Sequence, residues 1–243
     1  MVLCESYCCG SVSSGANLPS VLPRRRVFIS KRLAWVLRHG AHKVGLTLTK
    51  GGYLYVDDVL QTPSFHGVTL EDIRQVVDSD DKTRSELWPS PESGRLRVRA
   101  FQGHRLPIED MDLTPITDPS HYPVVVHGTY IRNWERIRVE GLKRMSRTHI
   151  HFAPGEPGEA DVISGMRSNA ELVIHIDLAK ALHDGFKFYL SQNRVILTEG
   201  DSQGCLPPAY FTAVYQRNPQ ACLLIQGALC SSAEAVLKVS LPH

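Results

Sequence analysis

The chain has 243 residues, enough for one domain or two small ones, and its 42% of apolar residues suffices for a packed core. With 27 Lys and Arg against 25 Asp and Glu, the net charge is only +2, so any nucleic-acid surface must come from local clusters of cations. No apolar run approaches a membrane span, and no CxxC pair occurs among the six cysteines, which argues against a zinc ribbon or a disulfide scaffold.

The first 26 residues carry three of the cysteines without helical or strand periodicity, and residues 1–26 are expected to form a disordered leader. They lack the charged and apolar regions of a secretory signal. Arg24 to Arg26 follow a serine-containing stretch poor in acidic residues, which leaves an organellar transit peptide open as a minor alternative. Otherwise the expected compartment is the cytoplasm or the nucleus.

Three short helices are expected in the next segment. Ser30, followed by apolar residues at helical spacing and then by Gly40, predicts the first helix, with Ser30 as its N-cap and Gly40 as its end. Asp57 and Asp58, before Val59-Leu60, predict a second. Thr69, with Asp72 at the capping-box position, predicts a third.

A β-hairpin follows these helices. Its first strand begins at Ser85, its turn ends at Gly94, and its return strand covers residues 95–101. Three helices and a hairpin describe a winged-helix module, a common nucleic-acid-binding fold. Alternation along the return strand turns Arg95, Arg97 and Arg99 to one face, which is either an RNA contact or a solvated edge that discourages aggregation.

Prolines and polar residues at 111–123 are typical of a linker, so a domain boundary is expected there. Beyond it, Val124 to Val126 predict a short buried strand, and His127-Gly128-Thr129 is expected to form its turn, with Thr129 capping a helix that ends at Gly141. Further alternating segments predict a strand-rich α+β lobe over residues 122–225. Neither GxGxxG nor GxxxxGK[ST] occurs, so a Rossmann or P-loop site is not supported. Residues 226–243 form a tail to which no role is assigned.

The segment from Arg147 to Phe152 is the strongest candidate for a binding site. Side chains two apart on a strand share a face, so His149 and His151 point the same way, next to Arg147. This pattern suits a phosphorylated ligand, and the alternative is an exposed polar strand face. A metal triad of His127, the His149-His151 pair and the His175-x-Asp177 pair is a rival, disfavoured by the nearby arginines.

The chain's distinctive polar side chains are cationic or neutral rather than acidic. Arginines bind phosphate through bidentate, charge-assisted bonds, so this set favours phosphoryl or nucleotide transfer over hydrolysis by paired carboxylates. Read in order, six motifs resemble the tRNA 2′-phosphotransferase family, the NAD-dependent RNA 2′-phosphotransferases, over about residues 28 to 213. The motifs are Ser30-Lys-x-Leu-x-x-x-Leu37-Arg38-His39-Gly40, Val98-Arg99-Ala-x-Gln102-Gly103-His104, Val126-His127-Gly128-Thr129, Arg147-x-His149-Ile-His151-Phe152, Ile163-Ser164-Gly165-Met166-Arg167 and Asn193-x-Val195-Ile-Leu-Thr198.

The resemblance implies a winged-helix RNA lobe at residues 27–115, an ADP-ribosyltransferase-like NAD lobe at 122–225, and an active site between them. It implies that the internal 2′-phosphate of ligated tRNA attacks NAD and expels nicotinamide. The resulting RNA 2′-phospho-ADP-ribose intermediate then gives 2′-hydroxyl RNA and ADP-ribose 1″,2″-cyclic phosphate. The protein is expected to work without a metal ion and to be a monomer.

The resemblance also assigns residues. The family's catalytic Arg-His-Arg-Arg set falls on Arg38, His39, Arg99 and Arg147. The residues that the resemblance assigns to NAD binding are His127, Gly128, Thr129, His149, Ser164, Gly165 and Arg167. Those that it assigns to RNA binding are Lys31, Arg95, Arg97 and His104.

The sequence departs from the family pattern at two places that are expected to affect RNA binding. Lys82-Thr-Arg84-Ser stands where the family commonly has Lys-Gln-Arg-Phe, and Arg105 rather than Ser follows His104. Two other functions therefore stay open: an ADP-ribosyltransferase acting on terminal phosphates of RNA or DNA, and a non-catalytic RNA-binding module. The biological RNA is not given by the sequence.

Overall fold

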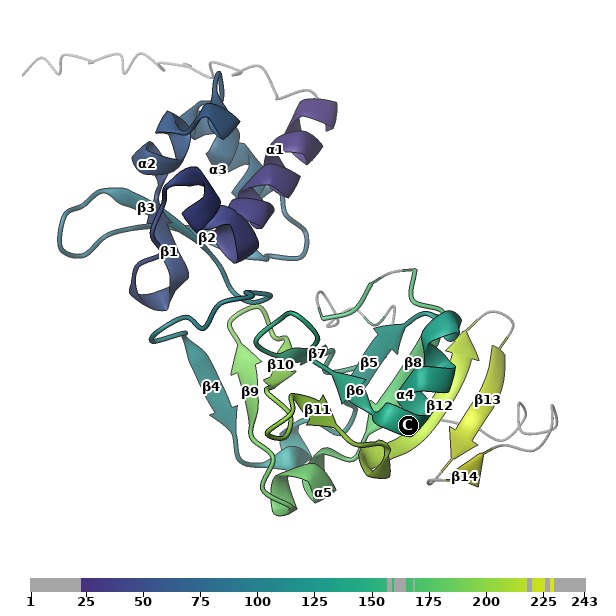
Figure 1. The fold of residues 1–243 in the computed structure, drawn as a ribbon. Helices are drawn as coiled ribbons and strands as arrows, with labels where there is room; N and C mark the ends of the chain where they lie inside the picture. The colour runs from purple at the N-terminus through teal and green to yellow at the C-terminus, as the bar shows by residue number, and fades with distance from the viewer. Residues whose placement is uncertain are drawn as a thin grey trace, which may run out of the picture.

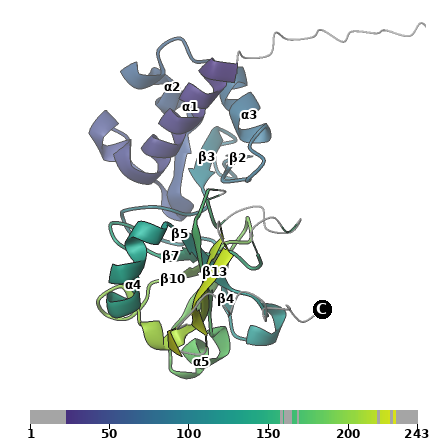
Figure 2. The same cartoon turned by 90° about the vertical axis from the view of Figure 1, so that its right-hand side faces the viewer.

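The computed structural model describes residues 23–156, 159, 165–167, 169–217, 220–225 and 228–229. It combines helices and antiparallel sheets, so the predicted α+β class is confirmed. The chain forms two lobes stacked end to end, with the first helices in one lobe and most of the strands in the other (Figures 1 and 2).

The first lobe has three helices against one small sheet (Figure 1). The α-helices are α1 (Pro23–Trp35), α2 (Val56–Gln61) and α3 (Leu70–Asp78), and the strands are β1 (Tyr53–Tyr55), β2 (Ser85–Pro89) and β3 (Leu96–Ala100). The sheet order is β1-β3-β2, with both pairs antiparallel. Helix α1 runs on into a π-helical turn, η1 (Val36–Gly40), and a 3-10 turn, η2 (Ala41–Val44); η3 (Lys50–Gly52) and η4 (Pro63–Phe65) are 3-10 turns.

The capping box of α3 is confirmed, because Thr69 accepts from the Asp72 amide and Asp72 accepts from the Thr69 amide. The bounds predicted for the first helix are wrong. The helix begins at Pro23, so Ser30 lies inside it, and helical structure continues past Gly40 to a C-cap at Gly45, where φ is +77°. Gly40 meets a packing requirement instead, since a Cβ there would collide with the Trp35 ring.

The hairpin and its alternation are confirmed. Val98 and Ala100 are buried against the helices, in a core cluster that includes Leu33 and Leu37 of the helical segment. Arg97 and Arg99 point to the opposite face of β3, across from tyrosines of β1. The pattern of period two therefore decides which side chains this sheet offers to the rest of the molecule.

The second lobe contains two larger antiparallel sheets (Figure 2). Both contribute to its main core cluster, and Val126, Ala153 and Val173 form a smaller, separate cluster. One sheet has the order β4-β9-β10-β7, and its strands are β4 (Leu113–Ile116), β7 (Ile150–Phe152), β9 (Phe188–Ser191) and β10 (Ile196–Thr198). The other has the order β14-β13-β12-β8-β5, from β5 (Val126–Thr129), β8 (Leu172–Ile176), β12 (Phe211–Arg217), β13 (Gln220–Ile225) and β14 (Ala228–Leu229). The remaining elements are α4 (Trp134–Glu140), α5 (Leu178–His183), the pair β6 (Leu142–Lys143) and β11 (Cys205–Leu206), and 3-10 turns at Pro119–His121, Ile131–Asn133 and Pro208–Tyr210.

Two predictions for this lobe need correction. The segment 111–123 is not a free linker, because β4 pairs with β9 and so belongs to the second lobe. His127, Gly128 and Thr129 lie in β5 rather than in a turn, and Thr129 does not cap the following helix. Its hydroxyl accepts a hydrogen bond from Asn133 instead. Pairing of β5 with β8 outweighs the local turn tendency of a His-Gly-Thr sequence.

Polar contacts join the lobes. The Thr148 amide donates to the His104 carbonyl over 3.0 Å, and the Asn193 side-chain amide donates to the Lys82 carbonyl over 3.2 Å. The Lys82 ammonium in turn donates to the Met166 carbonyl over 3.3 Å. These bonds hold the segments that precede β7 and β8, and the turn between β9 and β10, against the first lobe. No helix in the described part of the chain is long and apolar enough to cross a membrane.

Candidate active site

A cleft of about 550 Å³ lies where the two lobes meet. Eight of its lining residues are lysine or arginine, and none of the described lining residues is acidic. The eight are Arg38, Lys82, Arg84, Arg132, Lys143, Arg144, Arg147 and Arg167. In a chain of nearly balanced charge, this concentration of cations marks a site for an anion.

Arg38 enters the cleft from the π-helical turn, and Gly103 makes room for it. Gly103 has a φ of +88°, and a Cβ there would lie 3.4 Å from both Cδ and Nε of Arg38. The backbone after β3 therefore lies directly against the Arg38 side chain, whose Nε is buried and has no hydrogen-bond partner. The glycine thus allows the close approach of an arginine side chain to the backbone.

The arginines of the cleft repel one another. Burial, followed by the charges of Arg84 and Arg147, lowers the pKa of Arg38 to about 10. Desolvation and the charges of Arg167 and Arg105 lower the pKa of Arg147. Neither Arg38 nor Arg147 forms an ion pair with a carboxylate in the described part of the chain, and the charge of Asp80 only partly offsets the repulsion at Arg38. A bound phosphate would restore the balance and accept charge-assisted hydrogen bonds.

Lys82 and Arg84 line the cleft although the sequence had marked them only as departures from the family pattern. Asp80 accepts hydrogen bonds from the Arg84 guanidinium, at 2.6 Å, and from the Arg84 amide, at 2.8 Å. These bonds fix the turn that leads into β2. The sequence signal for this side of the cleft was the pair of cations at positions 82 and 84, just before the hairpin.

The three cleft histidines are neutral at neutral pH. His127 Nδ1 donates to the His151 carbonyl over 2.8 Å, which leaves Nε2 as an acceptor. Burial, followed by the charge of Arg147, lowers the pKa of His151 to about 3, and its Nε2 is buried and unpartnered. Burial also lowers the pKa of His127 and of His149. The histidines thus supply hydrogen-bonding groups, while the arginines supply the charge.

Most residues assigned to NAD lie on the second-lobe wall of the cleft. They are His127, Gly128, Thr129, His149, Gly165 and Arg167, whereas Ser164 lies outside the described residues. The Arg167 guanidinium donates to the Tyr130 hydroxyl over 3.0 Å, and Arg132 lies 4.7 Å from the Tyr130 ring centre. The sequence interpretation missed Tyr130 and Arg132, which directly follow the His-Gly-Thr motif.

Several assigned residues do not reach the cleft. Arg99 is buried and paired with Glu86 at 2.6 Å and with Asp112 at 3.3 Å. His39 and His104 line a separate cavity in the first lobe. The three remaining residues assigned to RNA also lie outside the cleft. Arg95 is paired with Asp57 and Asp58, and Arg97 lies 3.9 Å from the Tyr53 ring centre. Lys31 is exposed beside α3.

Substituting Arg99 by alanine is expected to lower the melting temperature by several degrees. The substitution leaves Glu86 half-buried without its guanidinium partner and separates β3 from Asp112. Thermal unfolding of Arg99→Ala, with the exposed Arg95→Ala as control, measures the effect. Equal melting temperatures for both variants would contradict a structural contribution of Arg99.

The rival metal site is not assembled. No group of three potential ligands gathers among the described residues. His175 pairs with Glu156 at 2.8 Å, and Asp177 accepts from the Lys180 amide at the start of α5. Both are therefore engaged away from His149 and His151.

A two-lobed α+β protein with a cationic cleft, whose described lining carries no carboxylate, has the features of an enzyme acting on a phosphorylated ligand. The family described as RNA 2′-phosphotransferase, Tpt1 / KptA family, matches residues 24–200. The chain is 46% identical over 200 residues to tRNA 2′-phosphotransferase 1 of Danio rerio, covering 82% of this chain and 89% of that protein. It is 43% identical over 196 residues to tRNA 2′-phosphotransferase 1 of Homo sapiens, covering 80% and 78%. A probable RNA 2′-phosphotransferase of Rhizobium leguminosarum is 33% identical over 172 residues, covering 70% and 88%. The chain belongs to the RNA 2′-phosphotransferase family.

Proposed function

We propose that this protein removes an internal 2′-phosphate from RNA, with ligated tRNA as the substrate class and NAD as the acceptor. The observation that carries the proposal is the cleft, whose described lining has eight cations and no acidic residue. The family membership and the relatives' names support the same reaction.

We also propose what each lobe does. The three helices and the hairpin of the first lobe correspond to a winged-helix RNA lobe at residues 27–115. The two sheets of the second lobe correspond to an ADP-ribosyltransferase-type NAD lobe at residues 122–225, to which β4 must be added. Both lobes contribute arginines to the cleft, so RNA held by one lobe would meet a dinucleotide held by the other.

The second-lobe wall suits NAD. The dinucleotide has an anionic pyrophosphate and flat aromatic rings, and this wall offers Arg132 and Arg167 beside the ring of Tyr130. Nε2 of His127 is available as an acceptor, and Gly165, where φ is +99°, lets this wall of the cleft lie close against the backbone of Phe152 and Ala153. When bound, NAD supplies a C1″ centre with nicotinamide as leaving group.

Arg38 and Arg147 would hold the 2′-phosphate. The phosphate is already an anion, so its attack needs orientation more than a base, and two guanidinium groups on opposite lobes provide it. They would also stabilise charge that accumulates on the phosphate oxygens during its later transfer. The neutral histidines cannot donate as imidazolium at neutral pH, so their expected contribution is hydrogen bonding. Arg99 would join them only by leaving Glu86 and Asp112.

The proposal is tested with an RNA that carries one internal 2′-phosphate. Purified protein is incubated with this RNA with and without NAD, and without added metal, and the RNA and small molecules are analysed by mass. NAD-dependent loss of the phosphate with release of ADP-ribose cyclic phosphate is expected. Transfer of ADP-ribose only to a terminal phosphate, or RNA binding without reaction, would overturn the proposal.

A further inference from the structure

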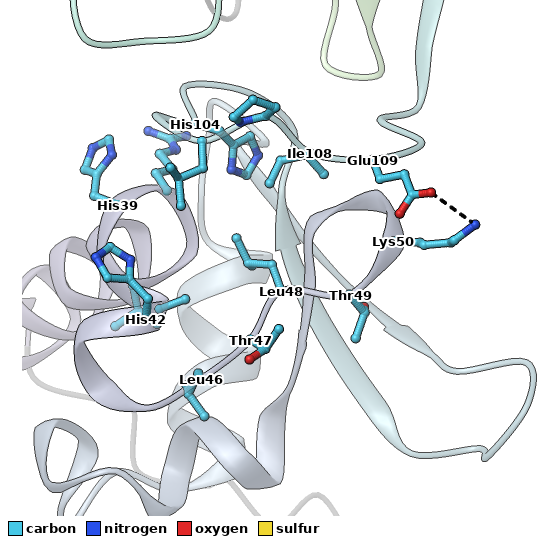
Figure 3. A pocket seen from close by; sticks show the side chains of 15 residues that line it. His39, His42, Leu46, Thr47, Leu48, Thr49, Lys50, His104, Ile108 and Glu109 are labelled. Carbon is cyan, nitrogen blue, oxygen red and sulfur yellow. Dashed lines mark ion pairs between the residues drawn. The ribbon is translucent and has the colours of Figure 1, made fainter.

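A second cavity of about 330 Å³ lies inside the first lobe, outside the cleft (Figure 3). It is lined by three segments, which are the turns after α1, residues 46–50 and residues 104–109, and it is open on one side. Its walls include the side chains of His39, His42, Leu48, His104 and Ile108, which surround one hollow in Figure 3. None of the contacts described for the cleft uses this space.

Arg38 connects the two spaces. It is the one described residue that lines both the cleft and the cavity. A phosphate bound by Arg38 in the cleft therefore lies one side chain away from the cavity. The part of an RNA nucleotide nearest to its 2′-phosphate is its sugar, and the base attached to that sugar or to the next one is the group that can extend past Arg38.

The chemistry of the cavity differs from that of the cleft. Burial lowers the pKa of His39, and burial lowers the pKa of His104 to about 4, so both rings are neutral at neutral pH. Lys50 is paired with Glu109 at 3.5 Å and with Asp110 at 3.3 Å. Apart from Arg38, the cavity therefore offers no unpaired charge among the described residues, and it suits an uncharged ligand.

Its lining favours a flat heteroaromatic ring. Leu46, Leu48 and Ile108 provide apolar contact, and the imidazoles of His39 and His42 provide surfaces for stacking. The volume lies at the lower end of the range for small-molecule sites.

We propose that this cavity binds a nucleobase of the substrate RNA, either that of the 2′-phosphorylated nucleotide or that of the nucleotide that follows it. The inference rests on the proposed function. The base would lie behind Arg38, next to a phosphate held in the cleft. Because stacking accepts any base, the cavity orders the strand without selecting its sequence.

The test is a double-mutant cycle that combines one change in the protein with one change in the RNA. Leu48→Trp fills the cavity, and its partner change is an abasic site at the 2′-phosphorylated nucleotide or at the next one. The dissociation constant of each RNA is measured without NAD. An abasic site is expected to weaken binding to the unaltered protein by ~10-fold, and Leu48→Trp to weaken binding of the intact RNA by a similar factor. In the variant, the abasic site should cost little more, because the two changes remove the same contact.

Two further variants make the result decisive. Val139→Trp adds the same ring to an exposed position of α4 and should bind every RNA like the unaltered protein. If Leu48→Trp fails to fold, His42→Ala, at an exposed residue of the wall, takes its place and should reduce the abasic effect. Full additivity of the protein and RNA changes at both abasic positions would overturn the inference. A weakening of NAD binding by Leu48→Trp without any coupling to the abasic sites would also overturn it, by assigning the cavity to NAD.

The same RNAs separate this inference from the proposed function. Coupling in the dissociation constants without NAD-dependent loss of phosphate retains the base site and rejects the reaction. Phosphate loss without coupling retains the reaction and rejects the base site.

Discussion

Replacing Arg147 by alanine is expected to reduce NAD-dependent release of the 2′-phosphate by at least ~100-fold, without lowering the melting temperature. The side chain lies in the cleft among other cations, and no carboxylate in the described part of the chain pairs with it. Its removal therefore deletes a phosphate ligand and relieves repulsion from Arg167 and Arg105 at the same time. Initial rates and thermal unfolding measured on one preparation test both parts.

The matched control is Arg138→Ala. Arg138 lies on α4 outside the cleft and pairs with Glu135 on the surface, so its loss should change neither rate nor stability appreciably. A folded Arg147→Ala protein with normal turnover would remove Arg147 from the site.

Replacing Arg38 by alanine is expected to have an effect of similar size, at least ~100-fold on product formation, for a different geometric reason. Arg38 reaches the cleft from the first lobe, while Arg147 reaches it from the second, so neither arginine can replace the other. Arg38→Lys retains the charge but loses the planar fork that binds two phosphate oxygens, and it should recover only part of the activity. Product formation and the dissociation constant for 2′-phosphorylated RNA should change together.

Lys43→Ala is the control for this series, because Lys43 is an exposed cation one turn beyond Arg38. Arg38 lies in a π-helical turn, so circular dichroism must accompany each assay. Full activity of Arg38→Ala in a folded protein would mean that the second lobe alone binds the phosphate.

Local patterns predicted what depends on neighbours in sequence. The Thr69 and Asp72 capping box and the alternation of Leu96 to Ala100 are properties of a few adjacent residues, and both are confirmed. Gly40 was misjudged because its reason is not local geometry but the Trp35 ring packed against it. β4 was missed because the pairing that makes it a strand comes from β9, more than seventy residues later.

In the site, too, local motifs were predicted correctly and contacts between distant residues were not. Arg38, Arg147 and the histidine pair were singled out from motifs, and the structure brings them to one cleft. Alternation also placed Arg99 on the correct face of β3, but the register of the hairpin sets Glu86 directly across from it. A single strand pattern does not reveal such a partner, which depends on where the turn places the other strand.

The cleft has a practical consequence for handling the protein, because two of its arginines, Arg38 and Arg147, have no carboxylate partner in the described part of the chain. Any anion that fits among them binds the native state and not the unfolded chain, so it raises the free energy of unfolding by mass action. At a free concentration one hundred times its dissociation constant, the gain is ~2.7 kcal/mol. The melting temperature of this protein is therefore a property of the protein together with its buffer, and values measured in phosphate and in a buffer free of oxyanions should not agree.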